Sequence, residues 1–145
     1  MPVWPRNYLG SISHSDELCV AHVAHSGDLL GIGVDLERLN ALPWDLIGQI
    51  SLPEEWECLS QGQTPDIDAA ILCFSAKEAI YKAYFPFARA FLEFTDVCLR
   101  VDWARGSFAA SMTADDRPSI AGRRHFNGRF ARIGNYIATA VWIER

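Results

Sequence analysis

Near the start of the chain, one stretch alternates roughly between hydrophobic and polar residues and a second is mostly apolar, and both patterns are typical of β-strands. These stretches cover residues 17–24 and 29–36 and are separated by His-Ser-Gly-Asp, a turn-forming sequence. We therefore expect residues 17–36 to form a β-hairpin. Residues 1–10 contain two prolines and a glycine and are expected to form an extended loop, which a compact polar segment follows.

The middle of the chain is expected to be helical. Residues 39–50 form a short predicted helix, and Pro53 suits the first turn of a second helix that stops at Gly62. After a loop, a longer helix is predicted over residues 67–85, and Pro86 is expected to end it.

The last third of the chain is expected to be antiparallel sheet. Strands are predicted at residues 96–102, 107–113 and 135–143, with turns at 115–119 and 123–128. The order of elements predicts an α+β fold, in which a mostly antiparallel sheet packs on one long helix with short helices beside it. No repeat or linker divides the chain, so we expect a single domain over residues 1–145.

Composition narrows the class of protein. Of the 145 residues, 50% are hydrophobic and 21% are charged, as in soluble globular proteins. The net charge of −5 does not favour nucleic acid or an anionic membrane as partner, and no apolar run is long enough to span a bilayer. The N-terminal residues have no secretion-signal pattern, and the cysteines show no metal-ligand spacing, so we expect reduced thiols in a cytoplasmic protein. These cysteines are Cys19, Cys58, Cys73 and Cys98.

Two acids lie at the end of the predicted strand 29–36. Asp35 and Glu37 are two residues apart, so their side chains project from the same face. Carboxylates held that close repel each other unless a proton or a cation lies between them, and hard divalent cations such as Mg²⁺ favour such a pair. The alternative is a pair of solvated acids at a strand end.

The long helix contains a second unusual feature. With Ile71 taken as the centre of an apolar stripe, Glu78 and Lys82 fall in the middle of that stripe. A lone carboxylate there costs several kcal/mol, so something must compensate its charge. Either Glu78 and Lys82 form an ion pair at the edge of the core, or Glu78 faces a cation and Lys82 an anion. With Asp35 and Glu37, Glu78 completes a set of three acids sufficient for one Mg²⁺.

The two stretches together resemble the signature of the 4′-phosphopantetheinyl transferase superfamily. The first is Gly-Ile-Gly-Val-Asp-Leu-Glu at residues 31–37, and the second is Phe-Ser-Ala-Lys-Glu-Ala-Ile-Tyr-Lys at residues 74–82. Segments around residues 4–15 and 84–97 are similar to the Sfp/EntD branch. The resemblance implies the transferase fold, as one pseudo-symmetric half with part of the connecting region.

The resemblance also implies roles for individual residues. Mg²⁺ is assigned to Asp35, Glu37 and Glu78. Lys82 is expected to contact a pyrophosphate oxygen of coenzyme A, with Lys77 supporting the same region, and Ser13 and His14 to hold the 3′-phosphate end. Glu54 lies where some members have a proposed catalytic base, although its neighbour Glu55 is an alternative. If the resemblance is set aside, His14 is expected to be a loop histidine that hydrogen-bonds within its own turn. Glu54 is then expected to be an acid in the first turn of a helix, where the helix dipole favours it.

In the Sfp/EntD branch, a further N-terminal half precedes the segment that begins here at Trp4 and Pro5. This chain is therefore expected to correspond to the C-terminal part of that pattern. An unpaired half would expose apolar surface, which self-association would cover, so a homo-oligomer is expected.

The implied reaction is Mg²⁺-dependent transfer of 4′-phosphopantetheine from coenzyme A to a serine of an acyl, aryl or peptidyl carrier protein, with release of 3′,5′-ADP. Such reactions occur in secondary-metabolite and siderophore biosynthesis. Residues 123–132 are one candidate for a local basic patch that binds an acidic carrier, and they also suit a solvated turn between strands. Two alternatives remain: a Mg²⁺-dependent nucleotide pyrophosphate hydrolase, and a non-catalytic remnant that binds coenzyme A or a carrier protein.

Overall fold

The computed structural model describes residues 2–40, 46–60 and 67–145. Its strands are β1 (Tyr8–Ser15), β2 (Leu18–His25), β3 (Leu29–Arg38), β4 (Val97–Asp102), β5 (Ser107–Met112), β6 (His125–Ile133) and β7 (Tyr136–Glu144). Its helices are α1 (Ile47–Ile50), α2 (Trp56–Leu59) and α3 (Ile67–Ala88), with short 3₁₀ turns η2 (Pro53–Glu55) and η3 (Phe94–Asp96). In this part of the chain, no helix is long and apolar enough to cross a bilayer.

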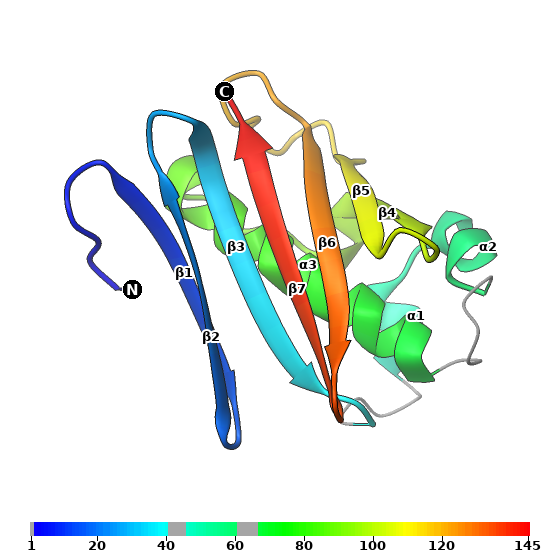
Figure 1. Ribbon diagram of the computed structural model, residues 1–145. Helices are drawn as coiled ribbons and strands as arrows, with labels where there is room; N and C mark the ends of the chain where they lie inside the picture. Colours follow the sequence, from blue (N-terminus) through cyan, green and yellow to red (C-terminus); the bar gives the residue numbers. More distant parts are fainter. Residues whose placement is uncertain (1, 41–45, 61–66) are drawn as a thin grey trace.

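Five strands form one antiparallel sheet in the order β3-β7-β6-β5-β4. The long helix α3 lies across one face of this sheet, and a separate β1–β2 hairpin stands beside β3 (Figure 1). The predicted α+β class, an antiparallel sheet packed on one long helix, is therefore confirmed.

The predicted hairpin over residues 17–36 is wrong. β2 pairs with β1, which was expected to be loop, while β3 pairs with β7. The backbone of β3 is buried from Gly31 to Leu36, so this segment needs partners on both sides. On the hairpin side, Ser11 and Ser13 provide them: their hydroxyl oxygens accept from the backbone N–H groups of Val34 and Leu36, at 3.0 and 3.2 Å.

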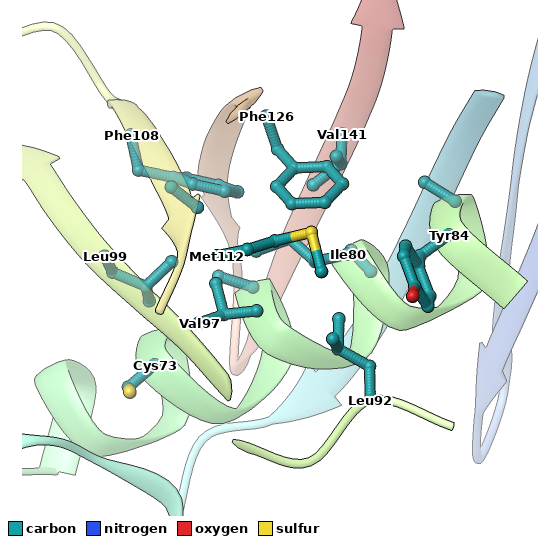
Figure 2. Close-up of a cluster of buried hydrophobic side chains, with 14 of the residues drawn as sticks. Cys73, Ile80, Tyr84, Leu92, Val97, Leu99, Phe108, Met112, Phe126 and Val141 are labelled. Carbon is teal, nitrogen blue, oxygen red and sulfur yellow. The ribbon is translucent and has the colours of Figure 1, made fainter. Parts of the chain in front are cut away.

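The face of α3 that packs on the sheet is made of small residues. Ala76, Ala79 and Ala83 are buried, and a Cβ added to Gly33 would lie 1.9 Å from the carbonyl oxygen of Ala79. The glycine thus permits a close approach of helix and strand that no larger residue allows. Figure 2 shows the rest of this core, with Ile80 and Tyr84 of α3 beneath aromatic and aliphatic side chains of the sheet.

The predicted apolar stripe centred on Ile71 is also wrong in its position. Glu78 and Lys82 lie at the half-buried edge of α3, whereas the neighbouring Lys77 is only 4% exposed. The assignment failed because alanines carry little weight in a hydrophobic pattern, yet close packing on the sheet selects them here.

Other boundaries differ from the prediction in smaller ways. α3 continues through Pro86 to Ala88, since a proline in the last turn removes few helical hydrogen bonds. The predicted turn at residues 123–128 instead leads into β6, which completes the sheet. Gly62 and residues 41–45 of the first predicted helix lie outside the described residues.

Glu55 connects η2 to the free edge of the sheet and to α3. Its carboxylate is fully buried and accepts from the backbone N–H groups of Leu52 at 2.6 Å and Leu99 at 2.8 Å. Its third donor is the Lys77 ammonium, 2.7 Å away, which also donates to the carbonyl oxygen of Phe94 at 2.7 Å. This pair therefore covers the edge of β4 and fixes α3 against it.

Replacing Glu55 should destabilise the fold far more than replacing its neighbour. Glu55→Gln leaves the buried Lys77 ammonium without its counter-ion, so we expect a loss of about 3–5 kcal/mol in the free energy of unfolding. Glu54→Gln, at an exposed position, should change it by less than about 0.5 kcal/mol. Urea denaturation measures both values, and equal effects would show that the buried pair does not stabilise the fold.

Candidate functional site

Asp35 and Glu37 point toward α3, as strand alternation predicts for two residues on one face. Asp35 pairs in register with Thr139 of β7. The hydroxyl of Thr139 lies 2.8 Å from that of Ser75 in α3, so this face of the sheet meets the helix. The two acids therefore lie on the side where α3 carries Glu78 and Lys82.

Asp35 is buried, with one of its two carboxylate oxygens satisfied. The Lys82 ammonium donates to Oδ1 at 2.8 Å and to the Val34 carbonyl oxygen at 3.0 Å, while the Ser13 hydroxyl is 3.3 Å from Oδ1. Oδ2 is buried and has no hydrogen-bond partner within the part of the chain that the structure describes. A charged oxygen left in this state is costly, so it calls for a proton shared with a neighbouring acid or for a cation.

Glu37 and Glu78 are both destabilised as anions. Burial and the negative charge of Asp35 raise the pKa of Glu37 to about 7. The same two causes raise the pKa of Glu78, against the opposing effect of Lys82. Three acids thus share one half-buried region with a single lysine, and a further cation there would relieve their repulsion.

The three acids are near neighbours but do not form a ready-made metal site. Over residues 2–40, 46–60 and 67–145, no group of three metal-ligating side chains is close enough to hold an ion. Instead, the Lys82 ammonium compensates the negative charge of Asp35, as expected for a group of acids that has no metal ion between them. The all-oxygen donor set and the unsatisfied Oδ2 of Asp35 nevertheless fit Mg²⁺.

The other predicted site residues are placed in different surroundings. Ser13 lies at the site, hydrogen-bonded to Asp35, whereas His14 is exposed because adjacent residues of β1 point to opposite faces. Lys77 is held by Glu55. Glu54 is exposed and Glu55 is buried, and no local pattern separates the two acids, because Leu52 cannot cap the helix with its side chain.

Sequence reasoning missed a cavity beside Glu78. It has a volume of about 330 Å³ and lies between α3 and the segment that leads to β4. Besides Glu78, its walls include Lys77, Tyr81, Phe91, Leu92 and Phe94. The closely spaced apolar residues Phe91, Leu92 and Phe94 were the available signal, but the pattern does not say whether they line a cavity or fill the core.

Comparison with known proteins identifies relatives over most of the chain. Residues 31–141 match the 4′-phosphopantetheinyl transferase superfamily, and residues 1–24 match the 4′-phosphopantetheinyl transferase N-terminal domain. The chain is 35% identical to 4′-phosphopantetheinyl transferase Svp of Streptomyces mobaraensis over 144 residues, which is 97% of this chain and 58% of that protein. It is 31% identical to 4′-phosphopantetheinyl transferase Npt of Nocardia iowensis over 150 residues, 97% of this chain and 67% of that protein. A shorter match is Enterobactin synthase component D of Escherichia coli K12, 36% identical over 84 residues, 57% of this chain and 39% of that protein.

Solved structures show the same fold. Holo-[acyl-carrier-protein] synthase of Thermotoga maritima superposes with a TM-score of 0.62 at 16% identity, covering 81% of this chain and 64% of that one. The Neisseria meningitidis synthase superposes with a TM-score of 0.56 at 19% identity, covering 81% of this chain and 99% of that one. These structures show a common fold, and the family match over residues 31–141 together with the sequence relatives shows that the chain belongs to the 4′-phosphopantetheinyl transferase superfamily.

Proposed function

We propose that this chain transfers 4′-phosphopantetheine from coenzyme A to a serine hydroxyl of an acyl, aryl or peptidyl carrier protein and leaves 3′,5′-ADP. The observation that carries the proposal is the buried Asp35, with one oxygen bound by Lys82 and the other unsatisfied, beside two acids with raised pKa values. Carrier proteins of secondary-metabolite or siderophore synthesis are the proposed acceptors.

The residues divide into those for a metal and those for the coenzyme. Asp35, Glu37 and Glu78 would hold Mg²⁺, which, when bound, neutralises charge on the pyrophosphate. Lys82 has a side chain 30% exposed, so its ammonium can donate to a phosphate oxygen while it remains beside Asp35. Ser13 and His14 are proposed to contact the 3′-phosphate.

Proton removal from the acceptor serine needs a carboxylate that is free to accept. Both oxygens of Glu55 already accept hydrogen bonds from buried donors. The adjacent residue, Glu54, is exposed, and we retain it as the proposed general base.

The cavity beside Glu78 is proposed to receive the pantetheine arm. The arm is a narrow chain of methylene, methyl and amide groups. Aromatic and aliphatic walls such as Tyr81, Leu92 and Phe94 suit its apolar part. With Glu78 among the lining residues, the phosphate end of the arm would lie toward the acids.

The assay for this function combines the protein with coenzyme A, Mg²⁺ and an apo carrier protein, followed by intact mass measurement of the carrier. We expect a phosphopantetheine adduct, and Lys82→Met should reduce its rate of formation at least about 100-fold, because Lys82 stabilises charge that develops during transfer. Circular dichroism checks that the variant stays folded. Consumption of coenzyme A without an adduct would indicate the hydrolase, and no reaction at all would indicate the binding-only remnant.

The acid cluster predicts a specific dependence of stability on pH and Mg²⁺. Since the pKa of Glu37 rises from 4.5 to about 7 in the fold, its ionisation lowers stability as pH rises through that range. In EDTA, Glu37→Gln should therefore have a higher melting temperature than the wild type at pH 8 and a similar one at pH 5. Mg²⁺ should stabilise the wild type at pH 8 and the variant much less. The exposed Glu17→Gln is the control, and if it behaves like Glu37→Gln the metal assignment fails.

The β1–β2 hairpin presents an apolar face that is proposed to bind a second copy of the chain. Three apolar side chains are exposed on this face: Tyr8 (50%), Ile12 (41%) and Val23 (53%). Strand alternation places them on the face of the hairpin away from the buried Ser11 and Ser13. Sedimentation velocity at micromolar concentration should show a homo-oligomer, and Ile12→Glu should shift it to monomer. A wild-type monomer at these concentrations excludes this form of self-association.

A further inference from the structure

A row of aromatic rings leads from the end of α3 to the cavity beside Glu78. Tyr81 contacts both Phe85 and Phe91, with ring centroids 5.6 Å apart in each pair. We call these three residues the aromatic ridge. Phe91 contacts Tyr81, yet it is 61% exposed. An exposed aromatic ring beside a cavity can bury a large apolar area when a partner binds.

An arginine follows the helix directly next to this ridge in sequence. Arg89 has φ = 52°, and its backbone N–H donates to the carbonyl oxygen of Phe85 at 2.9 Å, so it occupies the left-handed position after the last helical turn. Glycine is the usual residue there because any Cβ makes this conformation unfavourable. The Arg89 side chain is exposed and forms no ion pair with any other residue in the described ranges. Nothing in the fold itself therefore uses its guanidinium.

We propose that the aromatic ridge and Arg89 form the docking surface for the carrier protein, with the rings contacting an apolar helix surface and Arg89 an acidic side chain of the carrier. This inference rests on the proposed function. Tyr81 and Phe91 line the same cavity as Glu78, so a carrier seated on the ridge places its serine next to the acids. Because the chain has a net charge of −5, an unpaired arginine beside the site is also a local point of attraction for an acidic partner.

The basic segment considered in the sequence does not have this geometry. Arg129 pairs in register with Ala140, the neighbour of Thr139, so its side chain projects from the face of the sheet opposite Asp35. It lines a separate cavity with Trp142. A carrier bound there would present its serine on the wrong side of the sheet.

The experiment measures binding separately from transfer. The probe is an apo acyl carrier protein with its acceptor serine replaced by alanine, titrated by calorimetry into the protein loaded with coenzyme A and Mg²⁺. Arg89→Gly should weaken binding about 3- to 10-fold at low salt, with little difference at high salt, since the contact is electrostatic. The same substitution should raise the melting temperature, because glycine suits the left-handed backbone.

Three further variants make the test specific. Phe91→Ala should weaken carrier binding about 10-fold or more at any salt concentration, because its contribution is apolar. Glu93→Gln, which removes a negative charge from the cavity wall, should strengthen binding of the acidic carrier. Arg129→Ala, the charge-matched control, should leave binding unchanged.

Several outcomes overturn the docking surface. The first is a loss of carrier binding in Arg129→Ala but not in Arg89→Gly. The second is a wild-type protein that binds no carrier. The third is a Phe91→Ala variant that disrupts self-association but keeps its affinity for the carrier. Coenzyme A binding is titrated separately without carrier. If that binding persists while carrier binding does not depend on the ridge, the docking inference fails alone; if coenzyme A does not bind, the proposed function fails as well.

Discussion

The ion pair between Asp35 and Lys82 is the contact on which the site depends. It joins the middle of β3 to α3 at a buried position, and the hydroxyl of Ser13 extends it to the hairpin. Because Asp35 retains an unsatisfied buried oxygen, the pair alone does not satisfy this carboxylate, which can also accept a proton or a cation. The same contact thus orients three elements and leaves a place for a ligand.

A second constraint sets the distance between helix and sheet. The alanine face of α3 packs directly on Gly31 and Gly33, where a side chain would collide with the helix backbone. This close approach brings the half-buried edge of α3, with Glu78 and Lys82, near the acids of β3. The buried Glu55–Lys77 pair then holds α3 against the free edge of β4. The neighbouring Phe94 carbonyl also bonds to Lys77, so the wall of the cavity is anchored by the same ammonium.

The arrangement separates residues that maintain the fold from residues that are available to ligands. Lys77 and Glu55 are enclosed, and their hydrogen bonds are satisfied within the protein. Lys82, Glu37 and Glu78 are half-buried, and the raised pKa values of the two glutamates indicate negative charge that the protein does not balance completely. Adjacent residues of one helix, Lys77 and Glu78, therefore serve different purposes. Both border the cavity, but the Lys77 ammonium donates to Glu55 and to the Phe94 carbonyl oxygen, whereas Glu78 lies half-buried near Asp35 and Glu37.

Much of this was determined by local sequence. Alternation in β3 put Asp35 and Glu37 on one face, and the motif around residues 74–82 identified Glu78 and Lys82 as their partners; the α+β class followed from the order of elements. These features depend on backbone geometry within single elements, which neighbouring residues decide.

Only the tertiary structure decided which elements pair and which charges are buried. β3 joins β7, so that Asp35 pairs with Thr139, 104 residues later in the chain. The buried backbone of β3 requires hydrogen-bond partners that a local pattern does not identify. Glu54 and Glu55 are adjacent and chemically equal in the sequence, yet one is exposed and the other is enclosed by Lys77, Leu52 and Leu99. Burial and pairing of charge are set by groups distant along the chain, so no local pattern contains them.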